Sequence, residues 1–191
     1  MKDYLANEVR NVVVLGHSGA GKTAVIEGCM HFTKRIDKTG KNNDGTSALD
    51  FDLEEGKRGT SCYCHLAPVE WKEKKINFID TPGLNANDND DQEAIKAYKQ
   101  ANIILFVHNL SVGDIRKEEV RDIKTIISCF NNIDNLVDKF VLVLTGKDAI
   151  QSKDDLNNIK NKVLLDIKNE TGLTGFKVFA VSNTTYKNGL K

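Results

Sequence analysis

The feature that most constrains the fold of this chain is a glycine-rich stretch of eight residues. Residues 16–23 read Gly-His-Ser-Gly-Ala-Gly-Lys-Thr and fit the pattern G-x-x-x-x-G-K-[ST]. A nearly continuous apolar run at 11–15 precedes the stretch, as is typical of a buried parallel strand, and a helix-like segment at 22–32 follows it. In this context the backbone N–H groups of the turn wrap phosphate groups, and the helix N-terminus adds favourable positive potential. We therefore predict a phosphate-binding loop here.

Each part of this loop has an expected role. We expect contacts to phosphate from all of its residues: Gly16, His17, Ser18, Gly19, Ala20, Gly21, Lys22 and Thr23. The ammonium group of Lys22 should reach the β- and γ-phosphates, which makes Lys22 the candidate catalytic residue. The hydroxyl group of Thr23 should ligate Mg²⁺.

The rest of the chain alternates between strand-like and helix-like segments. Apolar runs typical of strands lie at 62–71, 75–79, 103–107, 140–144 and 177–181. Segments with helical spacing or helix caps lie at 92–100, 115–130 and 152–172. The short gap at 72–74 predicts a hairpin, whereas strands that alternate with helices predict parallel crossovers. The expected fold class is α/β: a mostly parallel six-stranded sheet with one antiparallel strand and helices on both faces.

A second motif, Asp80-Thr-Pro-Gly83, ends the strand-like run at 75–79. In open α/β sheets, ligands bind beyond the carboxyl ends of the strands, where this motif falls. Asp80 is therefore a candidate Mg²⁺ ligand through water. Gly83 can offer its N–H group to the γ-phosphate, because no Cβ blocks a close approach. The same four residues alone would make a common turn. Their position one hairpin after the phosphate loop is what indicates a second part of a nucleotide site.

A third motif, Thr145-Gly-Lys-Asp148, predicts a base-binding site. A carboxylate can accept hydrogen bonds from the ring N–H and the exocyclic amine of guanine, whereas adenine offers no such pair. Asp148 is thus expected to select GTP over ATP, with Thr145 and Lys147 beside it. Gly146 occupies the place where the usual [NT]-K-x-D pattern has Lys. The alternative is an ordinary loop in which Asp148 caps the next helix.

Two further positions follow buried strands. Ser182 and Asn183 come after the last strand-like run, where a loop can touch the base oxygen through its backbone. We include both as candidate base-binding residues, although the same residue types also occur in ordinary turns. His108 ends the run that begins at 103, and we expect it to be a partnered histidine of the core or its rim.

Charge and cysteine content narrow the function classes. Lys and Arg together number 27, as do Asp and Glu, so the formal net charge is zero. This balance argues against nucleic-acid binding driven by a net positive charge. Docking on a ribosome would then need a local patch of charge. With no secretory signal and no apolar run near the ~18 residues of a membrane span, the four cysteines indicate a cytoplasmic protein with free thiols. A metal site at Cys62, Cys64 and His65 is not expected, because no second ligand pair at zinc spacing exists.

In their order along the chain, the sites above resemble those of the Ras-like P-loop GTPase superfamily. Residues 11–83 are more similar still to the GTPase domain of elongation factor G and its paralogues. The similar runs are Gly16-His-Ser-Gly-Ala-Gly-Lys-Thr23, Asp44-Gly-Thr46, Asp50-Phe-Asp52, Glu54-Glu55, Lys57-Arg-Gly59, Leu66-Ala-Pro-Val-Glu-Trp71 and Ile76-Asn-Phe-Ile-Asp-Thr-Pro-Gly83. The resemblance implies GTP and Mg²⁺ as cofactors and makes residues 33–60 the first switch loop.

The resemblance also implies two roles near the γ-phosphate. The Mg²⁺-ligating hydroxyl of the family falls on Ser61, with Thr60 as the nearby alternative, and would ligate only when a γ-phosphate is present. Translation factors carry a His directly after D-T-P-G that positions the attacking water, and this chain has Leu84 there. They also have a His at the position of His17 without using it as the base, so a catalytic His17 is the lesser alternative.

Residues 80–130 resemble dynamin-like or Era-like GTPases through Thr-Pro-Gly-Leu-Asn and a polar second switch. The expected function is a Mg²⁺-dependent GTPase switch with slow intrinsic turnover, because no water-positioning side chain is evident. An unidentified partner that binds the switch loops 33–60 and 83–91, or a dimer, could supply one. The alternatives are a GTP-binding regulatory module that hardly hydrolyses and, on the altered third motif, an ATPase. Since few residues follow the last strand, residues 1–191 are expected to be a single GTP-binding domain at the front of a longer protein.

Overall fold

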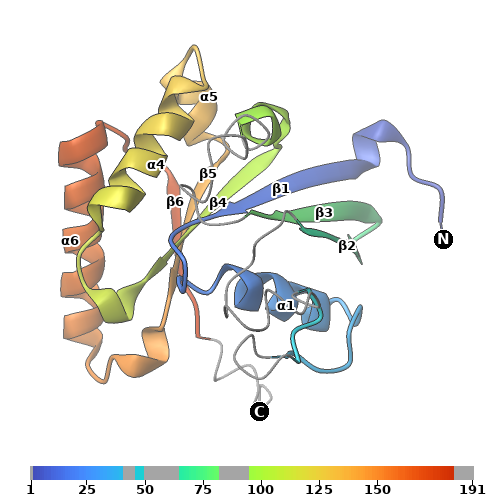
Figure 1. Cartoon of the computed structure of the whole chain (residues 1–191), viewed down its shortest axis with the longest axis horizontal. Coiled ribbons are helices and arrows are strands. Elements are labelled where there is room, and N and C mark those ends of the chain that lie inside the picture. The colour runs from blue at the N-terminus through green and yellow to red at the C-terminus, as the bar shows by residue number, and fades with distance from the viewer. Residues whose placement is uncertain (1, 41–45, 50–64, 82–94, 183–191) are drawn as a thin grey trace.

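A six-stranded sheet forms the centre of the molecule (Figure 1). The computed structural model describes residues 2–40, 46–49, 65–81 and 95–182. The strands are β1 (Val9–Leu15), β2 (His65–Trp71), β3 (Lys74–Asp80), β4 (Ile103–Asn109), β5 (Phe140–Thr145) and β6 (Lys177–Ala180). Their order across the sheet is β2-β3-β1-β4-β5-β6, and only the β2–β3 pair is antiparallel among these strands. The fold class predicted from the sequence is confirmed.

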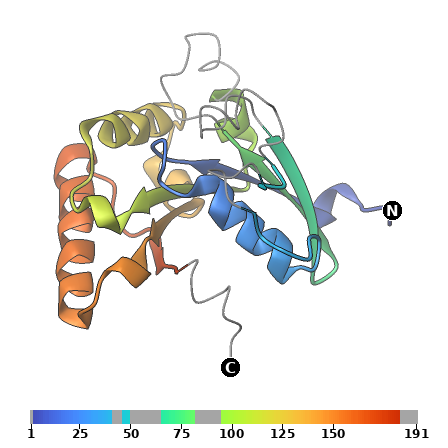
Figure 2. The ribbon, with the colours of Figure 1, turned by 60° about the horizontal axis from the view of Figure 1, so that its bottom comes forward.

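Helices cover both faces of this sheet. The α-helices with defined bounds are α1 (Lys22–Phe32), α4 (Lys117–Ser128), α5 (Ile133–Val137) and α6 (Lys153–Thr171), and residues 95–100 are also helical. Three-residue 3₁₀ turns are η1 (Ala6–Glu8), η3 (Leu110–Val112) and η4 (Lys147–Ala149). Figures 1 and 2 show α1 on one side of the sheet, with α4 and α6 side by side on the other. No helix within the described ranges combines the length and the apolar character that a membrane crossing requires.

The apolar strands divide their side chains between the two faces, because successive residues of a strand point to opposite sides. In β1, Val12 and Val14 join the core under α1, whereas Val13 and Leu15 join the core under α4 and α6. All four side chains are at most 5% exposed. A strand buried on both faces needs apolar residues at every position, which explains the continuous run in the sequence.

The sheet order places the ends of three parallel strands side by side. β1 lies between β3 and β4 and runs parallel to both, so the chain passes from β1 to either side of it. In open α/β sheets such a reversal of strand order leaves a crevice at the carboxyl ends of the central strands. The carboxyl ends of β1, β3 and β4 therefore lie at the same edge of the sheet.

Local signals in the sequence explain where several elements begin and end. Lys72 and Glu73 have φ values of 46° and 61°, as a tight hairpin turn between β2 and β3 requires. The Ser152 hydroxyl accepts hydrogen bonds from the backbone N–H groups of Asp154 and Asp155, at 3.1 and 3.4 Å, and so caps α6 as predicted. The short helix α5 was not predicted, since its five residues are too few to show a helical period.

Candidate functional site

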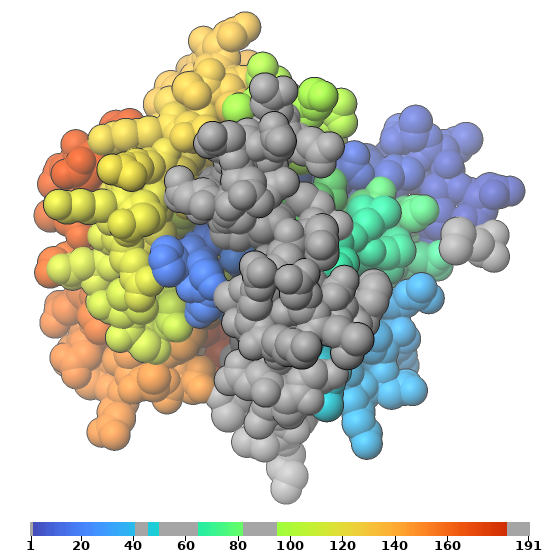
Figure 3. All heavy atoms as spheres, viewed as in Figure 1, coloured from blue at the N-terminus to red at the C-terminus, as the bar shows by residue number. Residues whose placement is uncertain are grey.

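The loop between β1 and α1 is held against the sheet by its first glycine. Gly16 has φ 142°, and a Cβ at this position would lie 2.2 Å from the carbonyl oxygen of Val107 in β4. Only glycine allows this close approach without displacing the β4 backbone. Farther along the loop, Ser18 and Gly19 are exposed. In Figure 3 the blue atoms of this region reach the surface beside the yellow-green atoms of the segment that precedes α4.

Lys22 lies inside the curve of this loop. Its side chain is only 7% exposed, and its Nζ donates to the carbonyl oxygens of Gly16 and His17 at 3.0 and 3.3 Å. A buried ammonium group is costly unless partners satisfy it, and these carbonyl groups supply that compensation. The chain thus holds a positive charge at the start of the predicted phosphate cradle.

Two candidate metal ligands from distant parts of the sequence meet beside Lys22. The hydroxyl group of Thr23 donates to Oδ2 of Asp80 at 3.0 Å, and the two side chains are 6% and 0% exposed. Thr81, the next residue, fixes this arrangement by donating its hydroxyl to the carbonyl oxygen of Val14 in β1 at 2.9 Å. A buried hydroxyl and a carboxylate are hard oxygen ligands of the kind that Mg²⁺ prefers, so this pair fits the ion.

The predicted base-binding loop is joined directly to the phosphate loop. The hydroxyl of Thr145, at the end of β5, lies 2.6 Å from the carbonyl oxygen of Ala20, to which it donates. Lys147 and Asp148 follow in η4, and both are exposed. A ligand that reached from the phosphate loop to Asp148 would therefore lie along this edge of the sheet.

The glycine in the altered third motif has a structural cause. Gly146 has φ 73°, and a Cβ there would lie 2.6 Å from Oδ1 of Asn109 and 2.9 Å from Oγ of Ser111. Those two side chains, from the segment after β4, fill the space beside the loop. Asn109 Oδ1 also accepts a hydrogen bond from the backbone N–H of Ser111 at 2.9 Å, which keeps its side chain in place.

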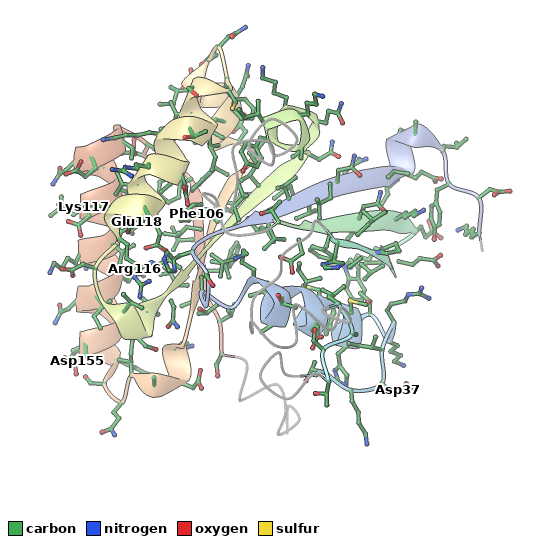
Figure 4. All side chains as sticks on the ribbon, viewed as in Figure 1. Asp37, Phe106, Arg116, Lys117, Glu118 and Asp155 are labelled. Carbon is green, nitrogen blue, oxygen red and sulfur yellow. The ribbon has the colours of Figure 1, made fainter. Side chains whose placement is uncertain are left out.

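An arginine that the sequence analysis did not select lies against the phosphate loop. Nη1 of Arg116, the residue before α4, lies 3.0 Å from Nδ1 and 3.2 Å from Nε2 of His17. Figure 4 labels Arg116 at the start of α4, on the side of the loop between β1 and α1. Nδ1 of His17 must donate to the carbonyl oxygen of Ser18 at 2.6 Å, which leaves Nε2 to accept from the guanidinium group.

His108 is a partnered core histidine, as expected. It is 1% exposed, and its Nδ1 lies 3.0 Å from Oε1 of Glu119, a carboxylate that is 2% exposed. Oε2 of the same carboxylate accepts the backbone N–H of Arg116 at 2.9 Å. The end of β4 and the start of α4 are thus joined through one buried carboxylate.

A second carboxylate that the sequence analysis did not select is Glu27 of α1, which is 1% exposed. It accepts hydrogen bonds from the backbone N–H groups of Gly40 and Ala48 and from the hydroxyl of Ser47, at 2.7, 2.6 and 2.7 Å. Segment 46–49 of the predicted first switch loop is therefore fastened to α1. The only sequence signal for Glu27 was a charge among the apolar positions of a helix.

Several predicted site residues lie outside the described ranges, namely Thr60, Ser61, Gly83, Leu84 and Asn183, together with Cys62 and Cys64. Ser182 follows β6 and is half-buried. For Cys29 of α1, burial raises the pKa of the thiol, so this cysteine stays protonated near neutral pH.

Comparison with known proteins gives both a family and related folds. The sequence pattern of the family described as "Elongation factor Tu GTP binding domain" matches residues 7–189. Elongation factor G of Fervidobacterium nodosum is 39% identical over 77 residues, which are 40% of this chain and 11% of that protein. The matched part is thus a small fraction of the curated relative's length.

Two solved structures have the same fold. The GTPase-like domain of S. cerevisiae Ski7, bound to GTP, gives a TM-score of 0.67 at 17% identity, over 92% of this chain and 43% of that chain. Toc33 from Arabidopsis thaliana, in complex with Mg²⁺ and GMPPNP, gives a TM-score of 0.62 at 19% identity, over 92% of this chain and 71% of that chain. At these identities the likeness concerns the fold alone.

Proposed function

Since this chain belongs to the family of elongation factor Tu-type GTP-binding domains in the P-loop GTPase superfamily, we propose that it is a Mg²⁺-dependent nucleotide switch. In this proposal it binds GTP at the carboxyl edge of its sheet and hydrolyses it slowly to GDP and phosphate. The proposal goes beyond family membership in naming the metal, the hydrolysis and the residues.

One observation carries the proposal: three predicted sites meet at one edge of the sheet. Lys22 lies in the phosphate loop, Thr23 bonds to Asp80, and Thr145 bonds to Ala20. Residues that are far apart in the sequence thus form one continuous strip, from the candidate metal ligands through the phosphate loop to the base loop. A nucleoside triphosphate has the same order of parts.

The proposed roles follow from the chemistry of these groups. Lys22 would turn from its carbonyl partners to the β- and γ-phosphate oxygens and stabilise the charge that builds up as the β–γ bridging bond breaks. Thr23 and Asp80 would hold Mg²⁺, which neutralises charge on the β- and γ-phosphate oxygens when bound. Backbone N–H groups of the loop would fix the phosphate chain for in-line attack by water. Turnover is expected to be slow, because Leu84 cannot orient that water.

The base preference tests the proposal. We expect purified protein with magnesium to prefer GTP over ATP in a displacement titration. Asp148→Ala should weaken GTP binding roughly 10- to 150-fold, since hydrogen bonds to a charged group contribute about 1.5–3 kcal/mol. Asp138→Ala, at the exposed Asp that directly follows α5, is the matched control and should leave the affinity unchanged. Lys22→Ala should abolish binding. Equal affinity for GTP and ATP would contradict the proposal.

A second candidate function is a GTP-binding module that signals by occupancy and hardly hydrolyses. Leu84, in place of the water-positioning His of translation factors, is the observation that favours it. Single-turnover measurements over hours, with and without candidate partners, separate the two functions. Release of GDP and phosphate supports the slow switch, whereas intact GTP throughout supports the module.

We also propose that the switch loops 33–60 and 83–91 contact an activating protein in the cytoplasm. The fastening of segment 46–49 to α1 by Glu27 supports the view that part of the first loop keeps a fixed base. A ribosome or a second copy of the chain could be that activator. Hydrolysis rates measured with added ribosomes, and across a range of protein concentrations, distinguish these two partners.

A further inference from the structure

The guanidinium group of Arg116 is a positive charge at the phosphate loop without an acidic partner among the described residues. Its Nη1 lies 3.0 and 3.2 Å from the two ring nitrogens of His17, the second residue of the loop. No carboxylate in the described part of the chain forms an ion pair with it. An arginine held against a phosphate-binding loop in this way is available to bind an anion.

Two cations contact the same residue of that loop. Lys22 Nζ donates to the backbone carbonyl of His17 at 3.3 Å, while the Arg116 guanidinium contacts the His17 ring. Ser18 and Gly19, which follow His17 in the loop, are exposed, so this part of the loop is accessible to an anion. An oxyanion bound at this loop would be attracted by the positive charges of both Lys22 and Arg116.

The backbone of Arg116 is fixed from the core. Its N–H donates to Oε2 of Glu119 at 2.9 Å, and the same carboxylate contacts Nδ1 of His108. His108 and Glu119 are 1% and 2% exposed, so this link is shielded from water. The guanidinium therefore extends toward the phosphate loop from an anchored position rather than from a free loop.

We propose that Arg116 is an in-chain phosphate ligand that binds the terminal phosphate of the bound nucleotide. Glu119 and His108 are the positioning residues that hold it at the loop. The proposal rests on the proposed function and adds a residue that discriminates between nucleoside triphosphate and diphosphate. A guanidinium group suits this role, because its planar fork can donate two hydrogen bonds to one phosphate group.

The test compares a non-hydrolysable GTP analogue with GDP. Arg116→Ala should weaken binding of the analogue at least tenfold and binding of GDP less than threefold, because only the analogue carries the terminal phosphate. Arg116→Lys keeps the charge but not the fork and should fall between wild type and Arg116→Ala. Lys117→Ala removes the neighbouring exposed charge and should leave both affinities unchanged. Equal losses for both ligands, or no loss, would overturn the role of Arg116.

The positioning role has its own readout. Glu119→Gln retains an oxygen that can accept the Arg116 N–H and should keep most of the analogue-over-GDP preference, whereas Glu119→Ala should lose it. If Glu119→Ala does not fold, a wild-type preference in Glu119→Gln supports the positioning role, and a preference reduced to that of Arg116→Ala refutes it. The wild-type preference should not depend on protein concentration, and a rise with concentration would overturn the in-chain arrangement.

Failure of the two proposals can be told apart. If the wild-type protein binds no guanine nucleotide, the proposed function and the role of Arg116 both fall. If it binds both ligands and prefers GTP to ATP, but Arg116→Ala leaves the analogue-over-GDP ratio unchanged, only the role of Arg116 falls.

Discussion

At Gly146, the side chains packed against the backbone restrict which residue type the motif can have. Its left-handed backbone, with φ 73°, is one that residues with a side chain rarely adopt. The side chains of Asn109 and Ser111 already occupy the place of a Cβ. The departure from [NT]-K-x-D therefore reflects the packing of the segment after β4, and leaves Asp148 in the next turn.

Substitution of this glycine should be destabilising. We expect Gly146→Ala to lower the free energy of unfolding by about 1–3 kcal/mol, the usual cost of a strained backbone conformation. The added Cβ would also push on Asn109 and Ser111, which should weaken nucleotide binding. Urea unfolding monitored by circular dichroism measures the first effect, and nucleotide titration measures the second.

A matched glycine controls for this measurement. A Cβ at Gly28, within α1, would meet nothing within 4 Å, and alanine suits a helix interior. Gly28→Ala should therefore raise the free energy of unfolding by about 0.5–1 kcal/mol. Similar changes in the free energy of unfolding for the two substitutions would show that backbone strain does not explain why residue 146 is glycine.

At the scale of elements, α1 does more than present the phosphate loop. Its Glu27 side chain accepts three hydrogen bonds from Gly40, Ser47 and Ala48, which tie these parts of the predicted first switch loop to the helix. A carboxylate that is 1% exposed is costly to bury unless it is satisfied in this way. Gly40 and segment 46–49 are therefore held against α1.

Removal of this carboxylate should free the base of the loop. In Glu27→Ala the amide protons of Gly40 and Ala48 lose their acceptor, and we expect their hydrogen exchange to be at least tenfold faster, a change of about 1.4 kcal/mol in local opening. Glu27→Gln keeps an acceptor oxygen and should retain part of the protection. NMR measurement of amide exchange, with the amides of β1 as internal reference, tests this prediction. Unchanged exchange rates at Gly40 and Ala48 in Glu27→Ala would contradict it.

At the scale of the whole molecule, aromatic packing joins three segments of the second half of the chain. The Phe140 ring of β5 lies 6.0 Å from the Phe106 ring of β4 and 5.2 Å from the Phe176 ring, centroid to centroid. Phe106 and Phe140 are both 0% exposed. These contacts hold β4, β5 and the segment before β6 together, and through them the base loop keeps its place beside the phosphate loop.

Loss of the central ring should destabilise the whole domain. Phe140→Ala should lower the free energy of unfolding by about 3–5 kcal/mol, the usual cost of emptying a buried aromatic site. Phe179→Ala, in the neighbouring strand but 55% exposed, should change it by only about 0.5 kcal/mol. Both free-energy changes can be measured from the denaturant midpoints of the variants. A small effect of Phe140→Ala would show that this cluster does not control stability.

Much of the fold and part of the candidate site could be predicted from the sequence, because their signals are local. The helix at 22–32, the Ser152 cap and the apolar strand of β1 depend on residues within one element, and the structure places them as expected. The predicted helix at 115–130 proved shorter, since α4 spans Lys117–Ser128. Metal and base ligands were predicted one by one, from motifs at strand ends.

The amino-acid sequence by itself determined the order of strands and helices, the phosphate loop and the class of ligand, because periodicity and motif spacing are properties of neighbouring residues. Only the tertiary structure decided that Arg116 reaches His17, that Thr145 bonds to Ala20 and that Glu27 holds segment 46–49. The first two contacts join groups that the sheet brings together across long stretches of chain, and the third joins α1 to a segment farther along the chain. Their energy depends on distance and burial, which no local pattern in a sequence records.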